Sequence, residues 1–144
     1  MSQDFRDVVA GRRQVHVVHE DSAHLAFLAE RPQRPGHVIV VTRALVDAVF
    51  DLDADAHAAL WAFVRVVARR LRERLPCQRV CVSVIGWVVR HAHVHLVPTD
   101  AAGQVPGLDG EPPPPAVMAE LAARLRGGST DAPAATPPAS QPRS

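Results

Sequence analysis

Lysine, tyrosine and asparagine are absent from this sequence, so all sixteen of its basic residues are arginine. The formal net charge is only +1, which gives no electrostatic reason to expect nucleic acid or an anionic membrane as a partner. No apolar run approaches the ~20 residues of a membrane span, and the start, MSQDFRDVV, has neither the basic nor the apolar region of a secretory signal. We therefore expect a cytoplasmic protein.

Cysteine is scarce as well. Cys77 and Cys81 are the only two, and no second cysteine pair completes a zinc site of the usual spacing. We expect both to be free thiols. Hydrophobic residues make up 47% of the chain, which is enough for one domain with a core of its own.

Short apolar segments bounded by turn residues predict five strands. Three follow each other in QVHVVHED, HLAFLAE and GHVIVVT, and two more are predicted at residues 79–86 and 88–98. RALVDAVFDL predicts a short helix, and Asp53 is the expected N-cap of a long helix that ends at Pro76. Its apolar stripe is Leu60, Val64, Val67, Leu71 and Leu75. The pattern favours an α+β fold with a five-stranded, mainly antiparallel sheet, one long helix and one or two short ones.

The last third of the chain has a different composition. We expect a domain over residues 1–100, then a linker and a short C-terminal helix over residues 101–126, the amphipathic helix itself being AVMAELAARLR, residues 116–126. Residues 127–144 are small, proline-rich and nearly uncharged, so the pattern predicts a disordered tail.

HAHVHLV, residues 91–97, places His91, His93 and His95 at every second position. In a strand this spacing puts three imidazoles on one face, because side chains alternate between faces. Three interpretations remain open at this point. The histidines form a structural or solvent-facing row, a metal site with His37 as a further nitrogen, or a site of nucleophilic catalysis.

The same segment resembles the histidine triad (HIT) family, whose motif is His-φ-His-φ-His-φ-φ with φ apolar. The likeness extends over roughly residues 5–99, including a Pro-Gly-His element at residues 35–37 and the long helix in DLDADAHAALWAFVRVVARRL. His37 followed by the triad in this order is far more specific than the triad alone.

This resemblance implies a nucleotide hydrolase or nucleotidyl transferase. His93 would attack the α-phosphorus of a nucleoside phosphate ester, anhydride or phosphoramidate, and water would release the nucleoside monophosphate from His93. His91 and His95 would orient His93 and contact phosphate, with His37 completing the cluster. The family usually forms homodimers with a sheet continuous across the interface, and no cofactor or catalytic metal is implied.

Several positions depart from the family pattern Ala-Gly-Gln-(Ser/Thr)-x-x-His. Gly86 is kept, but Trp87 replaces a phosphate-binding amide and Val88 replaces a hydroxyl that commonly serves the leaving group. We take Gly86, Trp87, Arg90 and Ser83 as candidate substrate-binding residues, Ser83 being the nearest polar substitute for an absent asparagine. The family's ribose-binding position falls at Ala29. The alternative function is therefore a nucleotide-binding or interaction protein with weak or no turnover.

Overall fold

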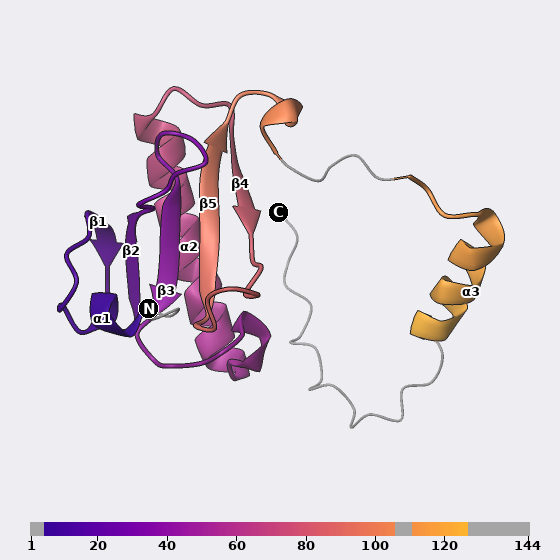
Figure 1. Cartoon of the computed structure of the whole chain (residues 1–144), viewed down its shortest axis with the longest axis horizontal. Coiled ribbons are helices and arrows are strands. Elements are labelled where there is room, and N and C mark those ends of the chain that lie inside the picture. The colour runs from indigo at the N-terminus through magenta and orange to yellow at the C-terminus, as the bar shows by residue number, and fades with distance from the viewer. Residues whose placement is uncertain (1–4, 106–110, 127–144) are drawn as a thin grey trace, which may run out of the picture. The chain divides into compact units, whose positions relative to one another are not determined.

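The computed structural model describes residues 5–105 and 111–126. Five strands form one antiparallel sheet in the order β1-β2-β3-β5-β4 (Figure 1). The predicted α+β fold is confirmed, including the meander of the first three strands. The strands are β1 (Val17–Glu20), β2 (His24–Leu28), β3 (Val38–Thr42), β4 (Arg79–Ser83) and β5 (His93–Thr99).

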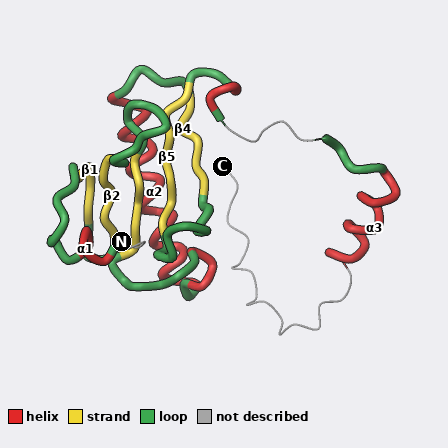
Figure 2. Tube along the Cα trace, viewed as in Figure 1, coloured by secondary structure: helices red, strands yellow, loops and turns green. Residues whose placement is uncertain are grey.

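The long helix α2 (Ala54–Arg74) covers one face of this sheet, as Figure 2 shows. It begins where predicted, because the Asp53 carboxylate accepts a hydrogen bond of 2.8 Å from the Ala56 N–H in its first turn. It ends at the predicted place too, since Leu75 has an extended backbone and Pro76 follows.

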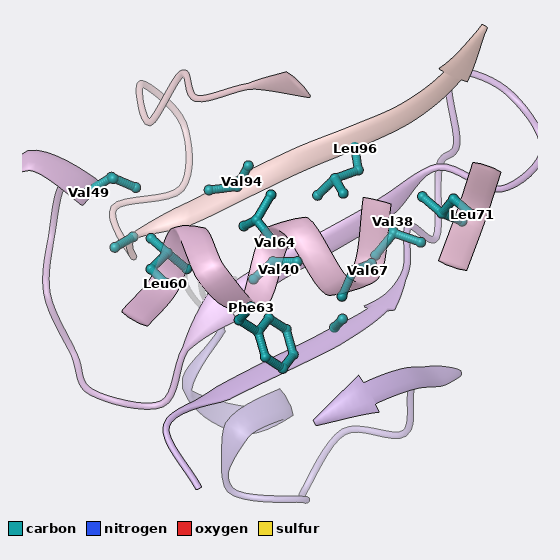
Figure 3. Packing of buried hydrophobic residues seen from close by; sticks show 12 residues of the cluster. Val38, Val40, Val49, Leu60, Phe63, Val64, Val67, Leu71, Val94 and Leu96 are labelled. Carbon is teal, nitrogen blue, oxygen red and sulfur yellow. The ribbon is translucent and has the colours of Figure 1, made fainter. Parts of the chain in front are cut away.

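The main core lies between α2 and the sheet (Figure 3). Four of the five stripe residues predicted for α2 are buried, and Leu75 is half-buried and packs against the same core. Phe63 joins them from the helix. The sheet contributes the small and branched side chains that suit a pleated surface, namely Ala26, Val38, Val40, Val94 and Leu96.

A second, smaller core covers the opposite face of the sheet. The short helix α1 (Arg6–Val9) places Val8 against Leu25, Phe27 and Val41, with Phe5 packed beside them. This is the face toward which the histidines of β5 point, because Val41 pairs with His93 across the β3–β5 ladder.

Three predicted elements are corrected by the structure. The strand expected over residues 79–86 ends at Ser83. The strand expected over residues 88–98 begins only at His93, which forms the last register pair with Val41 of β3. Residues 84–92 instead form a loop that turns at Gly86, where φ is +76°. The helix expected in RALVDAVFDL is reduced to a single 3-10 turn, η1 (Val49–Asp51), because the Val46 carbonyl accepts from the Ala92 N–H instead of from its own segment.

Two elements follow β5 in the chain, the 3-10 turn η2 (Ala102–Gln104) and the helix α3 (Pro115–Arg126). The bounds of α3 agree within one residue with the helix predicted over residues 116–126. The chain divides into two compact units, residues 1–108 and 109–144. The disorder expected for residues 127–144 lies outside the described residues. Within the described ranges, no helix combines the length and apolarity needed to cross a bilayer.

Candidate active site

Strand register places the histidines on one face of the sheet. His95 lies opposite Ile39 on β3 and opposite Ser83 on β4, and His93 lies opposite Val41. Directly opposite residues in an antiparallel ladder share a face, so Ser83, His93 and His95 point the same way.

His37 enters the site from the start of β3. It follows Gly36, whose φ of +90° makes the turn that returns the chain into the sheet. The Nε2 of His37 lies 3.0 Å from the Nδ1 of His95, and their ring centroids are 5.2 Å apart. His37 and His95, which the family resemblance assigns to one cluster, are therefore close together in space.

Hydrogen bonds determine which ring nitrogen carries the hydrogen in His37 and in His95. The Gln33 N–H donates to Nδ1 of His37 at 3.0 Å, so this nitrogen carries no hydrogen. A neutral His37 then has its hydrogen on Nε2 and donates to Nδ1 of His95. His95 consequently carries its own hydrogen on Nε2, where it can be donated to an oxygen of a bound phosphate.

A separate bond fixes the tautomer of His93. Its Nδ1 donates to the backbone carbonyl of His91 at 2.6 Å, because a carbonyl can only accept. The neutral ring therefore has its lone pair on Nε2. That nitrogen is the nucleophilic atom of the ring, and His95 lies next to it with 4.9 Å between ring centroids in an edge-to-face arrangement.

His91 is the most deeply buried member of the cluster, with 1% of its surface exposed. Its Nε2 donates to the Thr42 carbonyl at 2.7 Å, and its buried Nδ1 has no hydrogen-bond partner among the described residues. With Nε2–H occupied, the ring has no N–H left for phosphate. In this arrangement His91 orients His93 through its backbone carbonyl rather than through its imidazole.

Burial keeps the imidazoles of His37, His93 and His95 neutral. It lowers the pKa of His37 and of His93, and for His93 the neighbouring His91 ring adds to the effect while the bond to the His91 carbonyl opposes it. Burial, together with His93 and His37, lowers the pKa of His95 to about 4. All three are then uncharged near pH 7, as both a nitrogen nucleophile and the tautomers above require.

A hollow of about 320 Å³ adjoins His93 and is lined by residues 47–50, 84–87 and 90–93; we call it the His93 hollow. It contains three of the four candidate substrate-binding residues, Gly86, Trp87 and Arg90. The Arg90 guanidinium lies 3.6 Å from the Asp47 carboxylate at the surface. Ser83 instead lines a different hollow of about 200 Å³, together with Cys81 and Thr99.

Sequence reasoning missed two aromatic residues at the site. The Phe5 ring lies 5.3 Å from the His93 ring and 5.9 Å from the His91 ring, and it also packs edge-on against Phe27. Phe50 lines the His93 hollow. The apolar spacing of Phe5 and Val8 was a usable signal of a short amphipathic turn, whereas nothing local distinguished Phe50.

Other candidate ligands do not form a further centre. Cys77 and Cys81 are free, as expected, and the Cys81 sulfur lies 3.4 Å from the Thr99 hydroxyl. Within residues 5–105 and 111–126, no three His, Cys, Asp or Glu side chains are arranged to hold a metal ion.

Comparison with known proteins gives a consistent result. The family model described as the HIT domain matches residues 11–102. A HIT-like protein of Saccharolobus solfataricus is 30% identical over 100 residues, which cover 66% of this chain and 72% of that protein. A bifunctional bis(5'-adenosyl)-triphosphatase/adenylylsulfatase of Arabidopsis thaliana is 32% identical over 78 residues, or 51% of this chain and 43% of that protein.

Solved structures agree on the fold. The structure of SMU.412c from Streptococcus mutans is similar with a TM-score of 0.75 at 28% identity, covering 84% of this chain and 81% of that one. A HIT family protein from Bacillus subtilis gives a TM-score of 0.75 at 20% identity, covering 88% and 97%. With the family model matched over most of the sheet and the triad, this chain belongs to the HIT domain family.

Proposed function

We propose that this protein is a nucleotide hydrolase or nucleotidyl transferase that acts at the α-phosphorus of a nucleoside phosphate ester, anhydride or phosphoramidate. The observation that carries the proposal is the tautomer of His93. Its Nδ1–H is held by the His91 carbonyl, so its Nε2 lone pair is free to attack. Two relatives are bis(5'-adenosyl)-triphosphatases, which supports nucleotide hydrolysis as the class of reaction.

The first step forms a bond between Nε2 of His93 and phosphorus. The bond from phosphorus to the leaving group breaks, and the leaving group takes the electron pair. The Nε2–H of His95 donates to a phosphate oxygen and stabilises the negative charge that develops on it. His37 acts through His95, since its own Nε2–H keeps the His95 hydrogen on the nitrogen that faces the site.

The second step releases the nucleotide. Water attacks phosphorus and loses a proton to solvent, the nitrogen–phosphorus bond breaks, and Nε2 of His93 recovers its lone pair. If another nucleophile takes the place of water, the same intermediate makes the protein a transferase. Neither step requires a change in the tautomers of His37 or His91.

Rapid base quench with a panel of α-labelled nucleoside phosphate esters, anhydrides and phosphoramidates tests the proposal directly. We expect label bound to the protein and labile in acid, and none on a His93→Ala variant that keeps its fold by circular dichroism. A His16→Ala variant is the matched control, because the exposed His16 lies just before β1, outside the triad cluster and the His93 hollow. Full labelling of the His93→Ala protein would refute the mechanism.

The second candidate function is nucleotide binding with weak or no turnover. It is favoured by the loop at residues 84–92, which offers no hydroxyl or amide side chain, and by Ala29 at the expected ribose position. Glu30 is the nearest acid, and its carboxylate is already paired with Arg13. Saturable nucleotide binding in calorimetry, with no label trapped and no product from any substrate, would decide for this function.

We also propose that the protein forms a homodimer through the free edge of β4. Among the described strands, β4 pairs with β5 alone, and Val82 and Val84 at this edge are 44% and 38% exposed. An unpaired apolar edge strand readily pairs with another chain. Light scattering on the wild type should give twice the monomer mass, and Val82→Glu should reduce it to the monomer mass. A monomeric wild type at high concentration would exclude this assembly.

A further inference from the structure

Two of the protein's aromatic side chains are exposed, and both line the His93 hollow. Trp87 is 81% exposed and Phe50 is 80% exposed, whereas Phe27 and Phe63 are buried in the cores. Large apolar side chains that gather at one exposed position usually mark a site of ligand or partner binding. Here they line the same hollow as His93.

Phe50 is held in place although it is exposed. Its ring lies 5.7 Å from the ring of His57, and Nε2 of His57 accepts a hydrogen bond of 3.0 Å from the indole N–H of Trp61. Because Trp61 is half-buried against the main core, this chain of three rings supports Phe50 from α2. Little side-chain entropy would therefore be lost when a ligand stacks on Phe50.

The polar groups of the hollow cannot easily give a proton to a departing atom. The loop at residues 84–92 has no hydroxyl, amide or carboxyl side chain. Asp47, from the opposite wall, is paired with Arg90. A strongly basic leaving group, such as an alkyl amine or alkoxide, needs such a proton. A weakly basic leaving group does not.

We propose that the His93 hollow binds the leaving group of the substrate, and that this leaving group is a planar aromatic hydroxyl compound. The inference rests on the proposed function and names its substrate class as aryl esters of nucleoside monophosphates. Nε2 of His93 forms the bond to phosphorus while the phosphorus–oxygen bond to the aryl group breaks. The oxygen keeps the electron pair and leaves as an aryl oxide between Trp87 and Phe50.

A kinetic test compares two esters of the same nucleoside monophosphate. One has a substituted phenol as its leaving group, and the other has a fluorinated aliphatic alcohol of matched acidity. We expect kcat/KM to favour the aryl ester by about tenfold or more, which corresponds to about 1.4 kcal/mol. Trp87→Ala and Phe50→Ala should each reduce this preference, and the double variant should abolish it. Val66→Ala, an exposed apolar residue of α2 outside the hollow, should leave the preference intact.

A binding test separates this inference from the proposed function. Calorimetry compares non-hydrolysable phosphonate analogues of the two esters, one aryl and one fluoroalkyl. If the wild type binds the aryl analogue about tenfold more tightly but releases no nucleotide from any ester, the proposed function fails and the aromatic hollow stands. Equal binding of both analogues, or an aryl preference that survives in the double variant, would overturn the hollow as a leaving-group site.

A second copy of the chain is the competing occupant of the hollow. If dimerisation buried Trp87, the aryl preference would disappear as the protein concentration rises through the dimerisation range. That result would also overturn the inference. An aryl preference that is constant over this range supports it.

Discussion

The Nε2 of His37 lies 3.0 Å from the Nδ1 of His95, which joins two residues 58 positions apart in the sequence into one hydrogen-bonded pair. Together with the Gln33 N–H behind His37, this pair leaves His95 with its hydrogen on the nitrogen that is free to face a phosphate. The chemistry that we propose depends on this orientation as much as on the nucleophile.

Replacing His37 tests that dependence. His37→Phe keeps a ring but removes the donor to His95, so the His95 hydrogen can move to Nδ1 and face away from the phosphate. We expect kcat/KM to fall by about a hundredfold, and the nitrogen NMR signals of His95 to report the other tautomer. His37→Gln should recover part of the rate, because its amide can donate. Equal loss in both variants with an unchanged His95 tautomer would show that His37 has only a packing role.

The free energy of unfolding should decrease as the pH is lowered below the ordinary pKa of histidine. The pKa of His95 is lowered from 6.5 to about 4, so between these values the unfolded chain binds a proton that the folded protein does not. The contribution to the free energy of unfolding is fully present above about pH 6.5 and is lost as the pH falls toward 4. The lowered pKa values of His37 and His93 act in the same direction.

Urea denaturation at pH 7.5 and pH 5.5 measures this effect. We expect a lower free energy of unfolding at the more acidic pH, and a smaller difference between the two in a His95→Gln variant. A difference of the same size in both proteins would mean that His95 does not carry the dependence.

Gly36→Ala should destabilise the fold next to the site. The residue has a φ of +90°, and an added Cβ would lie 2.5 Å from Cδ1 of Leu75 and 3.1 Å from Cγ of Pro98. We expect a loss of about 1–3 kcal/mol in the free energy of unfolding, together with lower activity, because His37 follows directly. Gly11→Ala is the matched control, since φ there is +76° but no atom lies within 4 Å. If the two variants lose equal stability, crowding at Gly36 has no part in the effect.

Asp53→Ala should weaken the start of α2. The change removes the carboxylate that accepts from the Ala56 N–H, and loss of such a cap costs about 1 kcal/mol. Asp53→Asn should retain most of the stability, because its amide oxygen can also accept. Asp55→Ala removes a charge from the same turn without removing the cap, so thermal unfolding of the three variants separates the two contributions. An Asp55→Ala loss as large as that of Asp53→Ala would contradict the capping role.

Local pattern was sufficient where one segment decides its own structure. The N-cap at Asp53, the stop at Pro76 and the apolar spacing of α2 were all predicted, because capping, backbone restriction and helical periodicity act within a few residues. It was insufficient for residues 88–92 and for the helix expected in RALVDAVFDL. There the backbone follows partners on another strand or loop, as the bond from the Ala92 N–H to the Val46 carbonyl shows.

The sequence by itself determined that His93 and His95 would share one face of a strand, since side chains alternate between faces. Only the tertiary structure decided what each imidazole can do. The Thr42 carbonyl takes the N–H of His91, the His91 carbonyl takes that of His93, and the Gln33 N–H sets the direction of the His37–His95 pair. A histidine's function depends on which nitrogen holds the hydrogen. The partners of His37 and His93 are close in the chain, whereas the Thr42 carbonyl bonded to His91 and the His37 ring bonded to His95 come from distant segments. Only the folded backbone aims all of these groups at the rings.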